Sequence, residues 1–219
     1  MTIDTTRMES YYASRAPEYD EFYLKAERQK DLRAIERWLP PILANSEVLD
    51  VACGTGYWSK FLAPVASRYV GIDASPETLQ IARSRAVGGP ATFVVGNAYS
   101  IPLNLGKFSA AFAGFWFSHV PIGRRGEFLH GLKSSLSPGS KVVLLDNRFV
   151  EGNSSPISEP DADGNTYQIR KLKDGSTHRV LKNFPTEEEL HWSLAGAGSH
   201  GKLTAWEYFW AFEYVASES

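Results

Sequence analysis

The sequence predicts a doubly wound α/β sheet. Between about residues 46 and 147, short apolar segments alternate with segments whose apolar residues recur every three or four positions. The first apolar segment leads directly into a glycine-containing turn, "DVACGTGYWS". Strands that alternate with helices at this pace pair in parallel through right-handed crossovers, so we expect a parallel sheet with helices on both faces.

The N-terminal part of the chain is expected to be helical. Apolar side chains recur at three- and four-residue spacing through the first forty-five residues. Pro40 and Pro41 should stop this helix, because proline has no N–H to donate. We therefore expect a helical cap over residues 1–45 and a sheet domain over residues 46–219, together forming one compact domain.

Five strands and three intervening helices follow in order. The strands are expected in "SEVLDVA", "RYVGIDA", "ATFVVGNA", "KFSAAFAGFWF" and "SKVVLLDN". The helices are expected in "GYWSKFLAPVA", "SPETLQIARSRA" and "IGRRGEFLHGLKSSLSPG". Ser75 is the expected N-cap of the second helix, with Pro76 at its first position.

The pattern changes after Asn147. A loop rich in Ser, Pro, Asp and Gly leads into an expected β-hairpin with Asp174-Gly175 in its turn, and we place the whole insertion at about residues 151–184. Thr186 and Glu189 form the pattern of a capping box at the start of a helix. The closing segment "KLTAWEYFWAFEYVA" is one long strand or two strands joined by a tight bend. The aromatic residues of this region are expected mostly in the core: Trp192, Trp206, Tyr208, Phe209 and Trp210.

Composition narrows the class of protein. The chain has 219 residues, a net charge of −2 and a sequence pI near 6.2, so no overall basic charge favours nucleic acid. Cys53 is the only cysteine, which excludes a disulfide within the chain, and no Cys/His spacing suggests a metal site. No run approaches the roughly 18 apolar residues of a membrane helix. We expect a cytoplasmic protein, monomer or homodimer, without a membrane, nucleic-acid or metal partner.

The glycine-containing turn predicts an adenosine-type cofactor. Gly54 and Gly56 lie between the first strand and the next helix, where backbone N–H groups can face a ligand. Asp73 ends the second strand, and a carboxylate there can accept the two hydroxyl groups of a ribose. Ser59 is small enough for a dinucleotide loop, whereas a carboxylate at Asp50 would repel a pyrophosphate and attract an aminoacyl sulfonium. Asp50 can alternatively cap the following turn.

Three segments resemble the successive cofactor motifs of class I S-adenosylmethionine-dependent methyltransferases. They are "VLDVACGTGYWSKFLA", "VGIDASPETLQIAR" and "FVVGNAYSIP", and the resemblance covers roughly residues 46–145. The family usually has glycine where Ala52 stands and aspartate where Asn97 stands. The resemblance implies a Rossmann-like, mainly parallel, seven-stranded sheet, S-adenosylmethionine as cofactor and S-adenosylhomocysteine as product.

The resemblance also implies cofactor-binding residues, matched position by position. The methionyl end, the ribose and the adenine would be held by Asp50, Ala52, Gly54, Gly56, Asp73, Ala74, Asn97 and Ala98, with Phe115 at the end of the fourth strand and Tyr19 above the loop. N-terminal residues of such a cap are lid candidates, with Tyr11 as a candidate catalytic residue and Tyr12 and Arg15 as candidate substrate contacts. Plain amphipathic packing is the alternative for these N-terminal residues.

The methyl acceptor is expected at the carboxyl ends of the fourth and fifth strands. His119 is the first candidate for a general base or acceptor-orienting group, and capping of the helix near Ile122 is its alternative. Trp116 would line the pocket. Arg148 could hold an acidic substrate or form a surface ion pair.

The hairpin is interpreted as a substrate lid or a dimer contact. Tyr167, Arg170 and His178 are the side chains that could reach inward, although alternation allows only some of them to do so. The basic stretch "RKLKDGSTHRVLK" also fits a solvated hairpin.

The function predicted from these observations is methyl transfer to an O, N or S atom of a small molecule. One alternative is methylation of a macromolecule, RNA or protein, although the Asn/Asp-Pro-Pro-aromatic signature of amino-group methylation is replaced by "GFWF". A second alternative is a cofactor-binding subunit without catalysis. A nicotinamide-dependent oxidoreductase is a remote further alternative.

Overall fold

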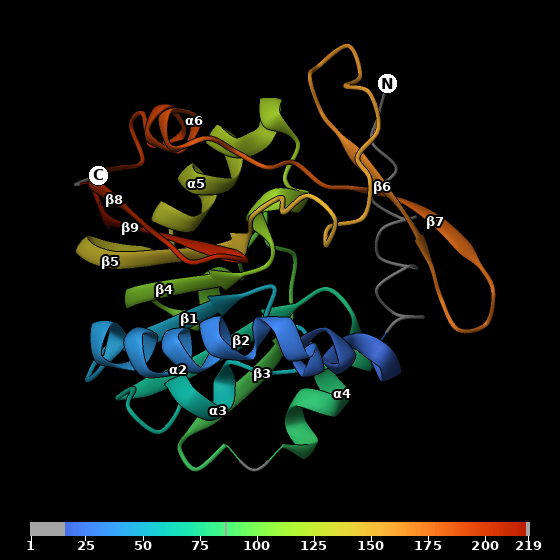
Figure 1. The fold of residues 1–219 in the computed structure, drawn as a ribbon. Helices are drawn as coiled ribbons and strands as arrows, with labels where there is room; N and C mark the ends of the chain where they lie inside the picture. The colour runs from blue at the N-terminus through green and yellow to red at the C-terminus, as the bar shows by residue number, and fades with distance from the viewer. Residues whose placement is uncertain (1–15, 86, 218–219) are drawn as a thin grey trace.

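A seven-stranded sheet lies at the centre of the molecule (Figure 1). The computed structural model describes residues 16–85 and 87–217. The strand order is β3-β2-β1-β4-β5-β9-β8. The strands are β1 Glu47–Val51, β2 Arg68–Asp73, β3 Ala91–Val95, β4 Phe108–Gly114, β5 Leu136–Asn147, β8 Gly198–Ala205 and β9 Phe209–Ala216. Strands β1 to β5 pair in parallel and β9 is antiparallel to β5 and β8, which confirms the predicted Rossmann-like, doubly wound sheet.

Alternating side chains of the central strands face two separate apolar cores. In β1, Val48 belongs to one core and Leu49 to the other; in β4, Phe112 and Ala113 divide in the same way. The core that contains Val48 is covered by α2 Gln29–Leu43 and α3 Ser59–Leu62. The core that contains Leu49 is covered by α5 Arg125–Lys133 and α6 Glu187–Ser193. Burial of strands on both faces explains why their sequences are apolar runs rather than alternating patterns.

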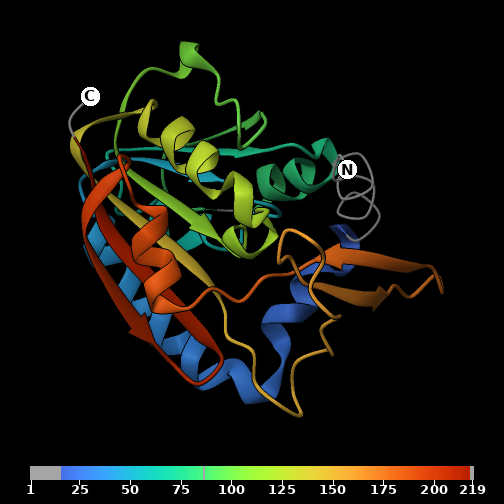
Figure 2. The ribbon, with the colours of Figure 1, turned by 90° about the horizontal axis from the view of Figure 1, so that it is seen from above.

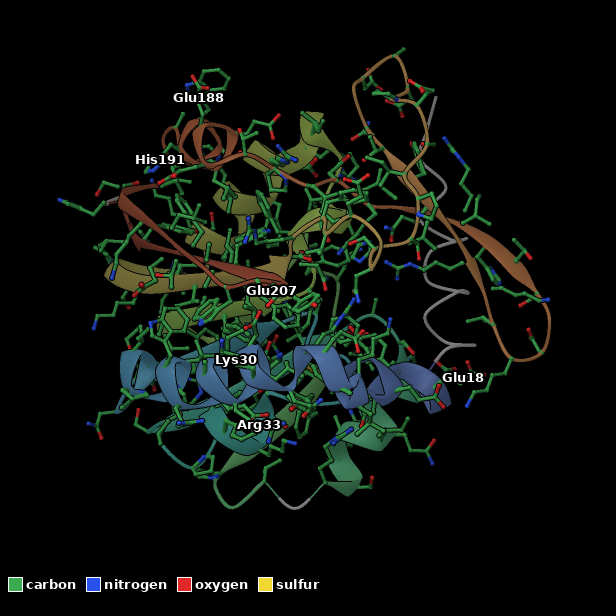
Figure 3. The ribbon with its side chains drawn as sticks, viewed as in Figure 1. Glu18, Lys30, Arg33, Glu188, His191 and Glu207 are labelled. Carbon is green, nitrogen blue, oxygen red and sulfur yellow. The ribbon has the colours of Figure 1, made fainter. Side chains whose placement is uncertain are left out.

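Helix α2 is amphipathic, as its sequence predicts. Its buried face carries Leu32, Ile35 and Leu39. Lys30 and Arg33 point away from the sheet into solvent (Figure 3). The 3₁₀ helices η1 Ala16–Leu24 and η2 Ala26–Arg28 precede α2, so the beginning of the described chain is wound more tightly than the expected α-helix.

The prediction that Pro40 and Pro41 stop this helix is wrong. Both prolines lie inside α2, which continues to Leu43. They occupy its last turn, so the helix loses only the hydrogen bonds that positions 40 and 41 would donate to the carbonyls four residues earlier, and burial of Leu43 favours the extra residues. The division of the chain at residue 45 stays a prediction.

Both predicted helix N-caps are confirmed. Ser75 accepts a hydrogen bond from the backbone N–H of Thr78 at 3.2 Å at the start of α4 Pro76–Ser84. Thr186 and Glu189 form the reciprocal hydrogen bonds of a capping box at α6. The helix expected in "GYWSKFLAPVA" is shorter than predicted, because only Ser59–Leu62 is helical.

The predicted hairpin is present as a separate two-stranded sheet. Strands β6 Tyr167–Lys171 and β7 Thr177–Leu181 pair antiparallel, with Asp174 and Gly175 in the turn. Seen from above, the hairpin extends away from the main sheet (Figure 2). The end of β7 reaches the loop after β4, where the N–H of Asn183 donates to the carbonyl of Ser118 at 2.8 Å.

The closing segment forms two strands, β8 and β9, joined at Trp206–Tyr208. Phe209 and Trp210 are buried as expected, but the prediction is wrong for Trp192, whose side chain on α6 is 67% exposed. Helix α6 buries Leu190, and Trp192 lies two residues further on, outside the buried stripe of so short a helix. Within residues 16–85 and 87–217, none of the helices has the length and apolar character required to cross a bilayer.

Candidate functional site

The turn after β1 adopts an unusual backbone. Ala52, Gly54 and Gly56 have φ angles of 57°, 54° and 73°, all in the left-handed region. At Gly56 a Cβ atom would lie 2.8 Å from Ser59 Oγ and 3.0 Å from Ala82 Cβ, so glycine is required there for packing against α4. Gly54 instead lies beneath the ring of Tyr19. A Cβ atom at Gly54 would lie 3.8 Å from that ring.

Asp73 holds this turn against the end of β2. Its carboxylate accepts hydrogen bonds from the N–H of Gly54 and the N–H of Ser75, each at 2.9 Å, and from the hydroxyl of Thr78 at 3.1 Å. Burial raises the pKa of Asp73, and the hydrogen bonds from Ser75 and Gly54 oppose that rise. The carboxylate is therefore fixed in one orientation at the edge of a cavity.

We call this hollow the glycine-loop cavity. It is lined by Tyr19, Ala52, Gly54, Asp73, Ala74, Ser75, Thr78, Gly96, Asn97, Ala98, Tyr99, Phe115 and Trp116. Asn97 Oδ1 accepts the N–H of Tyr99 at 2.8 Å, which fixes the loop after β3. The cavity thus collects the carboxyl ends of β1, β2, β3 and β4, the edge at which open α/β sheets bind ligands.

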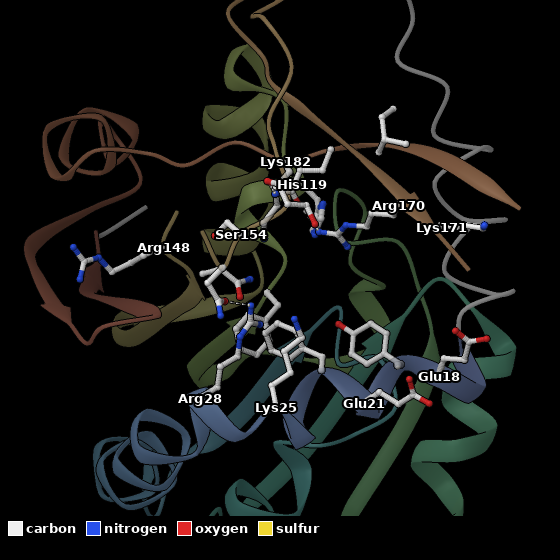
Figure 4. Close-up of a pocket in the computed structure, with 18 of the residues that line it drawn as sticks. Glu18, Glu21, Lys25, Arg28, His119, Arg148, Ser154, Arg170, Lys171 and Lys182 are labelled. Atoms are coloured by element: carbon white, nitrogen blue, oxygen red, sulfur yellow. Dashed lines mark hydrogen bonds between the residues drawn. The ribbon is translucent and has the colours of Figure 1, made fainter. Parts of the chain in front are cut away.

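A second hollow of about 480 Å³, the hairpin cavity, lies between η1, the loops after β4 and β5, and the hairpin. Tyr19 and Phe115 line both cavities and form the boundary between them. Figure 4 shows the side chains of the hairpin cavity, with His119, Arg170 and Lys182 on the hairpin side and Lys25 and Arg28 on the opposite side.

His119 is buried in the wall of the hairpin cavity, with 5% of its surface exposed. Its Nδ1 lies 2.6 Å from the carbonyl oxygen of Leu181. Because a carbonyl oxygen only accepts, Nδ1 carries the proton and Nε2 is the acceptor. Burial lowers the pKa of His119 well below its ordinary value, and the charges of Lys182 and Arg170 lower it further, so the ring is neutral at pH 7.

A buried ion pair lies behind His119. Lys182 Nζ donates to Asp146 Oδ1 at 2.9 Å and to Ser118 Oγ at 2.6 Å, with both charged side chains almost fully buried. Burial raises the pKa of Asp146, but the charges and hydrogen bonds around the carboxylate, led by the charge of Lys182, together hold that pKa below its usual range. The pair joins β5, the loop after β4 and the end of the hairpin.

The comparisons with known proteins agree with this geometry. A family profile described as "Methyltransferase domain" matches residues 48–139. The chain is 32% identical over 174 residues to the demethylmenaquinone methyltransferase of Clavibacter sepedonicus, a match covering 79% of this chain and 67% of that protein. The chain belongs to the class I S-adenosylmethionine-dependent methyltransferases.

Other relatives are matched over a smaller part of their own length. The chain is 27% identical to the demethylmenaquinone methyltransferase of Lactococcus lactis subsp. lactis (strain IL1403), over 66% of this chain and 60% of that protein. Further curated relatives are matched over about half their length, 49% and 46% in two cases. A solved structure described as "DhpI-SAM-HEP complex" superimposes with a TM-score of 0.79 at 26% identity, covering 96% of each chain.

The residues present fit the cofactor that this family uses, S-adenosylmethionine. The glycine-loop cavity offers a fixed carboxylate at Asp73, which suits ribose hydroxyl groups. Its far wall offers the amide of Asn97 and the backbone of Ala98, which suit an adenine edge. No group of three His, Cys, Asp or Glu side chains suited to a metal ion occurs among the described residues of the methyltransferase.

The predicted cofactor residues of the methyltransferase fall into two groups. All except Asp50 and Gly56 line the glycine-loop cavity. Asp50 is 2% exposed and accepts a hydrogen bond from the hydroxyl of Tyr69, so its carboxylate points into the interior. Burial raises the pKa of Asp50 to about 7, although the hydrogen bond from Tyr69 lowers it. The binding roles of these residues stay predictions.

The predicted substrate residues of the methyltransferase are more dispersed. Trp116 lines the glycine-loop cavity, and Arg148 lines the hairpin cavity as an exposed side chain whose Nη1 donates to the carbonyl of Trp206 at 2.6 Å. Tyr167 lines neither cavity: its hydroxyl donates to Asp161 and its ring packs against Arg179. The predictions for Tyr11, Tyr12 and Arg15 lie outside the described residues.

Several residues of both cavities were not predicted from the sequence. Thr78 and Tyr99 line the glycine-loop cavity from inside two of the quoted motifs, but the sequence analysis assigned them no role. Arg28 and Lys182 line the hairpin cavity from an amphipathic helical region and from a basic hairpin. Residues of these types are usually solvated in such segments, so only their placement in the fold reveals them.

Proposed function

We propose that this methyltransferase transfers the methyl group of S-adenosylmethionine to an O, N or S atom of a small molecule. One observation carries the proposal. Two cavities meet at Tyr19 and Phe115, one containing the fixed carboxylate of Asp73 and the other the buried imidazole of His119. A donor held in one cavity and an acceptor held in the other would react across this boundary.

The cofactor would be held by the residues of the glycine-loop cavity. Asp73 would accept the ribose hydroxyl groups, and Asn97 and Ala98 would contact the adenine edge. Ala52 and Gly54 would approach the methionyl part through their backbone. When bound, S-adenosylmethionine supplies an electrophilic methyl group on a positively charged sulfur, so the protein mainly provides alignment and a water-poor space.

We assign His119 the role of orienting the acceptor. Its Nε2 is the acceptor nitrogen of a neutral ring whose other nitrogen is bonded to Leu181. An O–H, N–H or S–H group of the acceptor could donate to Nε2 and thereby turn a lone pair toward the methyl group. A ring with so low a pKa is a weak base, which favours orientation over full proton abstraction.

A small acceptor is supported in two ways. The hairpin cavity, about 480 Å³, is the size of a small-molecule site. The relatives from Clavibacter sepedonicus and Lactococcus lactis are named for demethylmenaquinone, itself a small molecule. Their acceptor is not carried over to this chain, because a neutral quinone does not explain the basic side chains of the hairpin cavity.

The proposal is tested by cofactor binding and turnover together. Asp73→Ala should weaken binding of S-adenosylmethionine and S-adenosylhomocysteine at least about tenfold in calorimetric titration, because a charged acceptor of two hydroxyl groups is lost. Asp163→Ala, at an exposed loop aspartate, is the matched control and should bind as wild type does. His119→Ala should keep cofactor affinity and lose release of S-adenosylhomocysteine on a panel of small hydroxyl, amine and thiol acceptors.

The possible outcomes separate the alternatives. A wild-type protein that binds neither compound would refute the proposal. Tight binding without turnover on any small acceptor would favour the subunit without catalysis. Turnover that requires RNA or protein would favour macromolecular methylation.

A further inference from the structure

Arg28 is a buried cation with unused hydrogen-bond donors. Its side chain lines the hairpin cavity with 8% of its surface exposed. Nη2 donates to Asn153 Oδ1 at 3.3 Å, whereas Nε and Nη1 have no hydrogen-bond partner within residues 16–85 and 87–217. A buried donor left unsatisfied costs free energy, so such a side chain requires an explanation.

Packing alone does not supply that explanation. The guanidinium carbon lies 4.6 Å from the ring centroid of Phe22, a cation–π contact that a smaller or neutral side chain could replace with ordinary packing. Across the part of the chain that the structure describes, no carboxylate forms a salt bridge with Arg28. The exposed carboxylate of Glu27 accepts instead from Asn153 Nδ2 at 3.1 Å, on the far side of that amide.

Other basic side chains converge on the same space. Lys25 lies next to Arg28, and Arg170 reaches toward them from β6, where its Nη2 donates to Gln168 Oε1 at 3.2 Å (Figure 4). Lys182 closes the inner wall, with its charge balanced by Asp146. Six basic side chains line the cavity: Lys25, Arg28, Arg148, Arg170, Lys171 and Lys182.

The acidic side chains of the cavity do not balance this charge. Glu18 and Glu21 lie together at one side of the cavity, away from Arg28 (Figure 4). Glu21 is also paired with Lys173 of the hairpin turn. Burial lowers the pKa of the Arg28 guanidinium and the charge of Arg170 lowers it further, while the charge of Glu27 opposes this lowering without reversing it.

We infer that the hairpin cavity binds a small-molecule acceptor through an oxyanion group, a carboxylate or a phosphate, and that Arg28 is its principal contact. The inference rests on the proposed function, since it names the class of acceptor for the same site. A guanidinium presents parallel N–H donors that match two oxygens of a carboxylate or phosphate. The parallel pairs of a guanidinium are Nε with Nη2 and Nη1 with Nη2. The unpartnered donors of Arg28, Nε and Nη1, belong to different pairs, so each pair keeps an unused donor for an oxygen of the anion.

The position of Arg28 also determines the orientation of the acceptor. Phe22 and Phe115 are in edge-to-face contact, with centroids 4.9 Å apart, and Phe22 carries the guanidinium of Arg28 on its ring. The oxyanion would therefore lie in the hairpin cavity, beside Arg28, and not in the glycine-loop cavity. The remainder of the acceptor would extend past His119 toward Phe115, where the glycine-loop cavity begins.

The test is a two-stage calorimetric titration of the full chain. S-adenosylhomocysteine is titrated first, and then inorganic phosphate or acetate is titrated into protein saturated with it, at constant ionic strength. Arg28→Met should reduce anion affinity at least about tenfold while S-adenosylhomocysteine affinity stays within about twofold. Arg37→Met is the matched control, because Arg37 is an exposed arginine on α2, the helix that follows Arg28 directly, and donates to the carbonyl of Arg33. It should leave both affinities unchanged.

A second variant guards against a folding defect. Arg28→Lys keeps the charge and loses the paired donors, so its anion affinity should lie between wild type and Arg28→Met at an unchanged unfolding midpoint. The phosphate and acetate titrations also distinguish the two kinds of oxyanion. Tighter binding of phosphate indicates a phosphorylated acceptor, and tighter binding of acetate indicates a carboxylic acid.

The inference is overturned if wild type binds S-adenosylhomocysteine but neither anion, or if Arg28→Met binds the anions as wild type does. Failure of the proposed function gives a different pattern. In that case S-adenosylhomocysteine does not bind, while an anion site dependent on Arg28 remains.

Discussion

Two residues with side chains, Ala52 and Phe115, adopt left-handed backbone conformations with φ of 57° and 60°. Such conformations cost of order 1–3 kcal/mol each for residues other than glycine. Both lie at the carboxyl ends of the neighbouring strands β1 and β4 and line the glycine-loop cavity. The N–H of Phe115 donates to the carbonyl of Leu145 at 2.6 Å, which helps to hold it there. Two of the four non-glycine residues with such φ angles in the described chain therefore lie at the candidate site; the other two, Asn45 and His200, lie outside it.

Asp50 is the residue through which pH should most affect the stability of the protein. Burial raises its pKa from an ordinary value of 3.8 to about 7. A raised pKa in the folded state means that the associated stability is fully present below about pH 4 and is lost as pH rises through 7. At about 1.4 kcal/mol per pKa unit, the loss approaches about 4 kcal/mol.

Asp50→Asn should therefore stabilise the protein above pH 7 and leave it little changed near pH 4. Urea unfolding of variant and wild type across that range measures the difference, which should grow with pH. Tyr69→Phe is the companion variant: it removes a hydrogen bond that lowers this pKa, so the decline of stability should move to higher pH. Parallel stability curves for Asp50→Asn and wild type would contradict this account.

At the scale of single elements, capping determines where helices begin. Helix α6 has only seven residues, too few for a stable helix in isolation, and it begins at a capping box between Thr186 and Glu189. Its own propensity contributes little, so the cap and the burial of Leu190 determine its position.

Thr186→Ala should lower the free energy of unfolding by about 1 kcal/mol, because the N–H of Glu189 loses its acceptor. Thr186→Ser is the matched control and should retain most of that stability. Chemical denaturation measures both. Equal losses in the two variants would show that the methyl group of Thr186, rather than its hydroxyl, stabilises the helix.

At the scale of the whole molecule, the buried pair of Asp146 and Lys182 joins the hairpin to the sheet. Asp146 is the last residue but one of β5 and Lys182 follows β7, so the contact joins residues 36 positions apart in the chain. A buried pair adds little compared with apolar packing, but an unpaired buried charge is costly. The pair therefore determines where the hairpin attaches rather than how stable the sheet is.

Asp146→Asn should cost about 3–5 kcal/mol of unfolding free energy, because Lys182 is left buried without its carboxylate. The double variant Asp146→Asn with Lys182→Met should recover much of that loss. Lys202→Met removes the exposed partner of a pair with the half-buried Glu213 and should change stability by less than about 1 kcal/mol. A double variant as unstable as Asp146→Asn would indicate that the loss arises elsewhere.

The sequence by itself determined the parallel sheet, the succession of its central strands along the chain and the cofactor edge. The reason is that a strand, its following turn and the acid of the next strand lie within about 30 residues, so short-range spacing specifies their geometry. Gly54 and Asp73 are 19 residues apart and meet through one hydrogen bond. Turn residues and helix caps, such as Asp174-Gly175 and Thr186, were predictable for the same local reason.

Only the tertiary structure decided the character of the acceptor site. Arg28 and Lys182 are separated by more than half of the chain and belong to segments whose local patterns indicate solvated surface. A chain of net charge −2 gives no sign that it gathers six basic side chains around one cavity. The tertiary structure likewise decided that the carboxylate of Asp50 accepts from Tyr69. It also decided that the hydroxyl of Tyr167 donates to Asp161, away from the cavity. Side-chain direction at such positions depends on packing between distant elements, which spacing along the sequence does not specify.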